Sequence, residues 1–151
     1  MPDRLHVFLD SNILFSATYK QNHDFLRFWN TPEIIAMTSP YAVRETRRNC
    51  NSEVQLQRLD ILIEKTIIVS DAAPDIVPSG IHLPAKDIPI LASAIYASAD
   101  LLITGDKVHF SRWMNQPIKT HHGNLLIIMR PRPFLDWLRD DFGSRQNSTM
   151  L

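Results

Sequence analysis

The sequence predicts a three-layer α/β/α sandwich with a mainly parallel, five-stranded sheet. Short runs rich in Leu, Ile and Val alternate along the chain with segments whose apolar residues follow the helical period. These runs contain few polar positions, which is typical of strands that helices cover on both faces. We find no internal repeat and no domain boundary. We therefore expect a single domain over residues 1–142 and a flexible C-terminal tail over residues 143–151.

The expected elements alternate along the chain. Apolar runs predict strands at residues 5–9, 34–38, 66–69, 101–104 and 125–129. Helical patterns predict helices at residues 12–19, 24–29, 40–50, 53–63, 85–97 and 131–140. Ser39 and Pro40 mark one helix start, because Ser caps helices and Pro suits the first turn. Three prolines and a glycine predict a loop at residues 70–84, and residues 107–114 should form a short helix or loop.

The composition excludes several classes of protein. Lys and Arg number 16 and so do Asp and Glu, so a nucleic-acid partner would need a local basic patch or a metal. Cys50 is the only cysteine, so no internal disulfide can form, which fits a reducing compartment. No apolar run approaches the roughly 20 residues that span a bilayer, and the start lacks a signal-peptide pattern. We expect a cytoplasmic protein with no membrane partner.

Four carboxylates are expected at one edge of the sheet. Asp10 directly follows the first apolar run, and Asp106 follows the fourth. Asp87 lies near the start of the helix that leads into the fourth strand, and Glu45 lies about two turns into the helix after the second. The carboxyl ends of parallel strands and the starts of the helices share the edge where such sheets bind ligands. The four acids could therefore converge on one crevice.

Each acid also has a purely structural interpretation. Asp10 could cap a helix, Asp87 could complement a helix dipole, Glu45 could pair with Arg44 or Arg48, and Asp106 could occupy a turn. The coincidence of all four favours a site. Clustered carboxylates raise one another's pKa, and a bound divalent cation removes this penalty. Ligation by oxygen alone favours Mg²⁺ or Mn²⁺ over zinc.

Four stretches, in order, resemble the PIN-domain family of metal-dependent ribonucleases, which includes VapC-type toxins. The stretches are residues 8–14 (FLDSNIL), 39–45 (SPYAVRE), 86–94 (KDIPILASA) and 101–107 (LLITGDK). Each stretch alone is a weak signal, whereas the ordered set is fairly specific and covers roughly residues 5–129. The resemblance implies a PIN-like fold and a divalent-metal-dependent endoribonuclease that hydrolyses RNA phosphodiester bonds with Mg²⁺ or Mn²⁺.

The resemblance also assigns roles to residues of this chain. By resemblance, the catalytic acids are Asp10, Glu45, Asp87 and Asp106. Asp10, Asp87 and Asp106 are expected to ligate the metal directly or through water, while Glu45 ligates or orients the attacking water. Asn12 is expected to hydrogen-bond these carboxylates and so fix their rotamers.

Thr104 is expected to share that supporting role with Asn12. Arg44 and Lys107 are the basic residues nearest to the proposed site and are the expected contacts to substrate phosphate. Implied partners are an RNA substrate, the antitoxin of a toxin–antitoxin pair and a second copy in a homodimer. The RNA preference rests on the resemblance alone.

One departure from the family pattern keeps other functions open. Many relatives carry a further acid shortly after the fourth one, and here His109 takes that place. His109 could weaken a second metal site or let a neutral imidazole act instead, so a catalytically weak or inactive module that binds RNA or protein is one alternative. A haloacid-dehalogenase-like phosphatase is another. It usually needs a second Asp two residues after the first, where this chain has Asn12.

Overall fold

The computed structural model describes residues 4–19 and 23–142, so the expected tail at residues 143–151 lies outside the described residues. Its sheet has the strand order β3-β2-β1-β4-β6-β5. The strands are β1 (Leu5–Leu9), β2 (Ile34–Thr38), β3 (Ile67–Ile68), β4 (Leu101–Ile103), β5 (Pro117–Lys119) and β6 (Leu125–Met129). All neighbouring strands pair in parallel except β5, which runs antiparallel to β6. The predicted α/β class with a mainly parallel sheet is confirmed.

The strand count differs from the expectation, because the sheet has six strands rather than five. The sixth strand, β5, is three residues long, begins with a proline and buries only Ile118. Proline is tolerated at a sheet edge, where its missing N–H faces solvent, so this segment carries almost no strand signal in the sequence. At the other edge, the expected buried strand at residues 66–69 shrinks to β3, and both of its isoleucines are exposed.

The helices follow the predicted order. They are α1 (Ser11–Ala17), α2 (Arg27–Asn30), α3 (Pro40–Asn49), α4 (Glu53–Glu64), α5 (Ile88–Tyr96) and α6 (Pro131–Trp137). Shorter turns are η1 (His23–Leu26), η2 (Pro74–Ile76) and the π-helical η3 (Leu138–Phe142). Ser39 caps α3 as predicted, because its Oγ accepts a hydrogen bond from the Ala42 N–H at 3.3 Å. Helix α5 begins at Ile88 rather than Ala85, since residues 85–87 form a turn.

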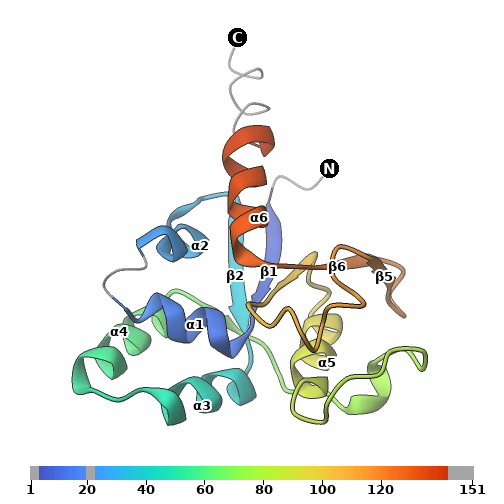
Figure 1. The fold of residues 1–151 in the computed structure, drawn as a ribbon, viewed down its shortest axis with the longest axis horizontal. Coiled ribbons are helices and arrows are strands. Elements are labelled where there is room, and N and C mark those ends of the chain that lie inside the picture. Colours follow the sequence, from blue (N-terminus) through green and yellow to red (C-terminus); the bar gives the residue numbers. More distant parts are fainter. Residues whose placement is uncertain (1–3, 20–22, 143–151) are drawn as a thin grey trace.

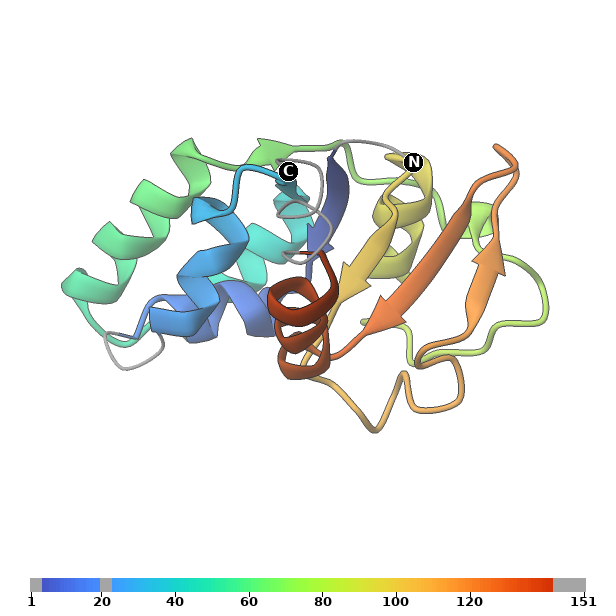
Figure 2. The same ribbon diagram turned by 90° about the horizontal axis from the view of Figure 1, so that it is seen from above.

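Helices cover both faces of the sheet. Figure 1 shows α6 above strand β6 and α5 below it, and Figure 2 shows α6 in front of the strands and α5 behind them. Helices α1, α3 and α4 pack together beside the β1–β2 half of the molecule. The central strands carry the core, where Val7, Phe8 and Leu9 of β1 are fully buried. None of the helices in the described part of the chain is long and apolar enough to cross a membrane.

The side of the sheet on which the chain adds new strands changes at β1. From β1 it proceeds to β2 and β3 on one side, and it then returns to place β4 on the other side of β1. The register pairs Leu9 with Ile103, so β1 and β4 end side by side. In open α/β sheets, the crevice outside the carboxyl ends of the strands at such a switch point is where ligands bind. The acids that follow β1 and β4 lie at this position.

Candidate active site

Asp10 is buried directly after β1, with 4% of its surface exposed. Its Oδ1 accepts a hydrogen bond from the Ser11 N–H at 2.6 Å and so caps α1. Its Oδ2 accepts a hydrogen bond from the Thr104 hydroxyl at 2.8 Å. Burial raises the pKa of Asp10 to about 6, although these two hydrogen bonds act to lower it; the charges of Asp87 and Glu45 raise it further. The capping and the site interpretations of Asp10 are therefore compatible.

Thr104 and Asn12 surround the Asp10 carboxylate, which is where the sequence analysis expects supporting polar groups. Thr104 follows β4, and its Oγ1 also accepts the N–H of Asp106 at 3.0 Å. The Asn12 amide nitrogen lies 3.5 Å from Asp10 Oδ2, and its Oδ1 accepts the Gly105 N–H at 2.8 Å. Asn12 thus ties the end of β1 to the loop after β4. The phosphatase alternative needs a carboxylic acid at this position to protonate the leaving group. The Asn12 side chain is an amide without an acidic proton, so it does not support phosphatase chemistry.

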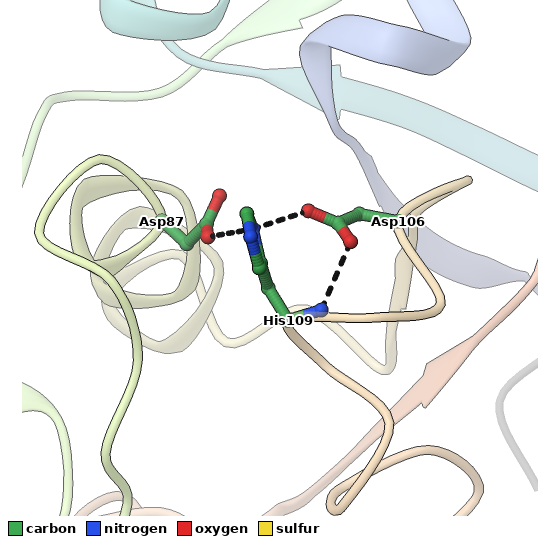
Figure 3. Close-up of side chains that lie close together, drawn as sticks. All are labelled: Asp87, Asp106 and His109. Atoms are coloured by element: carbon green, nitrogen blue, oxygen red, sulfur yellow. Dashed lines mark hydrogen bonds and ion pairs between the residues drawn. The ribbon is translucent and has the colours of Figure 1, made fainter.

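The second part of the site is the Asp87–Asp106–His109 cluster, shown in Figure 3. The Nδ1 atom of His109 lies 2.8 Å from Oδ2 of Asp87 and 2.7 Å from Oδ2 of Asp106. Asp106 also accepts hydrogen bonds at Oδ1 from the backbone N–H groups of Val108 and His109, at 3.1 and 3.0 Å. Asp106 therefore closes the turn after β4 with one oxygen and faces the imidazole with the other.

Asp87 occupies the N-cap position of α5, but its side chain makes no capping hydrogen bond. The residue is 7% exposed, and its buried Oδ2 has no hydrogen-bond partner. His109 Nδ1 is likewise buried, and its 2.8 Å contact with Asp87 Oδ2 is an ion pair when the imidazole is protonated. Burial raises the pKa of Asp87; the neighbouring His109 lowers it and the charge of Asp106 raises it. Helix capping does not explain Asp87.

Glu45 lies on α3 near Asp10, and its Oε2 accepts a hydrogen bond from the Ser11 hydroxyl at 3.0 Å. Among the described residues it forms no ion pair, so pairing with Arg44 or Arg48 does not account for it. Burial and the Glu45 carboxylate raise the pKa of Tyr41 to about 12, so this phenol stays protonated. The Tyr41 hydroxyl donates to the backbone carbonyl of Lys86, next to Asp87, at 2.9 Å.

The two expected phosphate contacts are exposed. Arg44 is 60% exposed at its side chain, and its guanidinium lies 3.7 Å from Asp71 Oδ2. Lys107 lies in the loop directly after Asp106. Lys107 therefore follows one acid of the cluster directly, and the exposed Lys86, which sequence reasoning did not propose, directly precedes Asp87 and lowers the pKa of that carboxyl. Arg44 is instead engaged with an acid on another loop.

The four predicted acids thus meet at one edge of the sheet but are not equally close. The candidate metal-ligand atoms of the Asp87–Asp106–His109 cluster, one from each residue, all lie within 4.8 Å of one another. Asp10 and Glu45 stand outside this group, and the charges of Asp87 and Glu45 both act on Asp10. Ser11, which joins Glu45 to the end of β1, was not predicted as a site residue; its place directly after Asp10 is the feature of the sequence that points to it.

The cluster fits a bound cation. It presents two carboxylate oxygens and one imidazole nitrogen, and two of these three atoms are buried without a hydrogen-bond partner. When the imidazole is neutral, the two buried atoms have no ion pair, and a cation between them would interact favourably with both. Carboxylates and imidazole are established ligands of divalent cations.

Comparison with known proteins identifies the fold. No family model matches the chain, and no curated protein sequence matches it. The structure of VapBC2 from Rickettsia felis, bound to a DNA fragment from its promoter, matches with a TM-score of 0.57 and 17% sequence identity, over 83% of this chain and 98% of that one. VapBC-1 from nontypeable Haemophilus influenzae matches with a TM-score of 0.50 and 16% identity, over 72% of this chain and 92% of that one. At these identities the similarity concerns the fold alone, and the predicted resemblance to VapC-type PIN domains is confirmed at that level.

Proposed function

We propose that this chain is a divalent-metal-dependent endoribonuclease that hydrolyses RNA phosphodiester bonds. The observation that carries the proposal is the meeting of four acids, from four separate segments, at the switch point of a PIN-like sheet. Such a concentration of negative charge is unfavourable by itself and becomes favourable when a cation is bound. Phosphodiester hydrolysis uses cations in this way, because charge develops on the phosphate oxygens.

Each acid has a proposed role. Asp87 and Asp106 would hold the cation, and Asp10 would contact it directly or through water. A bound Mg²⁺ or Mn²⁺ ion would lower the pKa of a water molecule and offset the charge on the phosphate. The Ser11 hydroxyl holds Glu45 in place, which suits Glu45 to orient the attacking water. Thr104 fixes the rotamer of Asp10.

Substrate binding would come from a local positive charge, since the net charge is zero. Lys107 is exposed beside Asp106 and would contact a substrate phosphate. Arg44 would contact a phosphate after leaving its present partner, Asp71. Contacts of this kind supply affinity rather than sequence recognition.

We further propose that the chain is the toxin of a toxin–antitoxin pair. Both structural neighbours reported above are VapBC proteins, which supports a cognate antitoxin as the partner. Expression of the wild-type chain alone in a bacterial host should arrest growth, and expression of Asp10→Asn should not. Equal growth inhibition by both would contradict a toxic nuclease activity. Homodimer formation and a cytoplasmic location remain predictions, and the mass in solution tests the first.

The direct test is cleavage of a mixed RNA substrate by the purified protein with Mn²⁺, with Mg²⁺ and with EDTA. The variants Asp10→Asn and Asp106→Asn should lose metal-dependent cleavage. Asp75→Asn is the matched control, because this aspartate is exposed on η2, outside the site. Cleavage that persists in both site variants would assign the activity to another site or to a contaminant.

A further inference from the structure

We infer that His109 is a ligand of the cation through Nδ1, and that its imidazole gives the site a stronger preference for Mn²⁺ over Mg²⁺ than carboxylates alone would. The inference rests on the proposed function, because it concerns the same metal centre. It adds a ligand, and with it a metal preference, that the acidic quartet does not provide.

The position of the imidazole is the first argument. His109 Nδ1 lies 2.8 and 2.7 Å from one oxygen each of Asp87 and Asp106, so it stands between the two carboxylates (Figure 3). Ligands at adjacent positions of an octahedron, with bonds of about 2.1 Å, lie about 3 Å apart. Small side-chain movements would therefore bring all three atoms onto one ion.

The second argument is the unsatisfied state of the atoms. Asp87 is more than nine-tenths buried, and its Oδ2 points into the cluster without a hydrogen-bond partner. His109 Nδ1 is also buried, and it contacts the two carboxylate oxygens as ion pairs only when a proton resides on it. A cation can take the place of that proton. A cation between these atoms would pair both at once. A neutral imidazole binds a metal through Nδ1 when its proton resides on Nε2.

The chemistry of nitrogen ligands supplies the preference. Carboxylate oxygens suit Mg²⁺ and Mn²⁺ alike, whereas imidazole suits first-row transition metals. Mg²⁺ also dehydrates reluctantly and prefers oxygen ligands with several waters. Replacing one oxygen ligand by His109 should therefore weaken Mg²⁺ more than Mn²⁺.

The turn after β4 supports a rigid ligand rather than a mobile surface histidine. Asp106 accepts the backbone N–H of His109 at 3.0 Å, and the following residue, Phe110, is fully buried. The backbone on both sides of the imidazole is thus anchored. A ligand held in this way loses little conformational freedom when a metal binds.

The test measures metal binding directly, without RNA. The purified protein is titrated with Mn²⁺, followed by the electron paramagnetic resonance signal of the free ion, and Mg²⁺ is added as a competitor. The variants are His109→Asp, which restores an acid, and His109→Asn, which removes the imidazole without adding charge. His122→Asp is the matched control, because this histidine is exposed in the turn before β6. Circular dichroism establishes that each variant is folded.

We divide the dissociation constant of Mg²⁺ by that of Mn²⁺ for each protein. This ratio should fall roughly tenfold or more in His109→Asp and stay unchanged in His122→Asp. Pulsed resonance spectra of bound Mn²⁺ should show coupling to a nitrogen nucleus in the wild type and in His122→Asp, but not in the two His109 variants. These results together would support the imidazole ligand.

Two outcomes would overturn it, and they are distinguishable. If Mn²⁺ binds without nitrogen coupling and the ratio is unchanged in His109→Asp, the inference is wrong while the carboxylate metal site of the proposed function stands. If the folded wild type binds neither ion, both the inference and the metal dependence of the proposed function are wrong.

Discussion

The hydroxyl of Thr104 donates a 2.8 Å hydrogen bond to Oδ2 of Asp10, although 94 positions separate the two residues. The contact exists because β1 and β4 are parallel neighbours and end at the same level. It also gives a buried carboxylate one of the few donors within its reach. Thr104 should therefore contribute to both the stability of the fold and the properties of Asp10.

Thr104→Val keeps the shape of the side chain and removes the donor. We expect it to lower the free energy of unfolding by about 1–3 kcal/mol, because a buried acceptor loses its partner. We also expect Mn²⁺ affinity to fall about 10- to 100-fold, since the Asp10 rotamer is no longer held. Chemical denaturation and Mn²⁺ titration measure the two effects.

Thr120→Val is the matched control for this change. Thr120 is buried like Thr104 and donates to the Asn124 side chain, far along the chain from the site. It should lose stability to a similar degree and bind Mn²⁺ normally. Equal losses of Mn²⁺ affinity in both variants would show that Thr104 acts through general stability alone.

The raised pKa of Asp10 predicts how the stability of the metal-free protein depends on pH. The folded-state value is about 6 and the reference value is 3.8, so the folded state favours the protonated carboxyl. This contribution to stability is fully present below about pH 3.8 and is lost as the pH rises through about 6. Two pKa units correspond to on the order of 3 kcal/mol.

The measurement compares urea unfolding of the wild type and of Asp10→Asn, both in EDTA, at several pH values between 4 and 8. The difference in unfolding free energy between the two proteins should shift in favour of Asp10→Asn as the pH rises. An added metal should reverse the trend for the wild type, because it binds the ionised carboxylates and its affinity rises with pH. A difference that does not change with pH would contradict the assignment.

Glu45 should matter for catalysis more than for metal binding, since it stands outside the cluster and contacts Ser11. We expect Glu45→Gln to reduce the rate of cleavage about 10²- to 10⁴-fold while leaving Mn²⁺ affinity nearly unchanged. Single-turnover cleavage and Mn²⁺ titration separate these effects. Glu64→Gln, at the exposed end of α4, is the control and should leave both quantities unchanged. A large loss of Mn²⁺ affinity in Glu45→Gln would make Glu45 a metal ligand instead.

Lys107 should contribute to RNA affinity through a phosphate contact. We expect Lys107→Gln to weaken RNA binding uniformly across sequences. The slope of log affinity against log salt concentration should become shallower by about the amount that one phosphate contact contributes. Lys119→Gln is the control, because Lys119 is exposed on β5. Binding is measured in EDTA at several salt concentrations, where no cleavage occurs. Identical salt dependence in Lys107→Gln and the wild type would exclude the contact.

The sequence by itself determined the order of the six α-helices that the structure describes and of every strand except β5, and the placement of the acids relative to the sheet. Each of these properties is local: an apolar run ends at Asp10 or just before Asp106, and a capping serine and a proline begin α3. The carboxyl ends of parallel strands necessarily share one edge, so convergence of the acids follows from the fold class. The α/β class could therefore be predicted from local patterns, whereas the PIN-like fold was predicted from the resemblance of four ordered stretches to the PIN-domain family.

Only the tertiary structure decided which atoms meet. That His109 departs from the family pattern can be predicted from the sequence, but its position between Asp87 and Asp106 depends on how α5 and the turn after β4 pack together. The same holds for β5, which is a strand because β6 lies beside it, and for β3, which forms the other edge of the sheet with both isoleucines exposed. Such contacts join distant segments through packing in three dimensions, and a one-dimensional pattern records only the period and the ends of each segment.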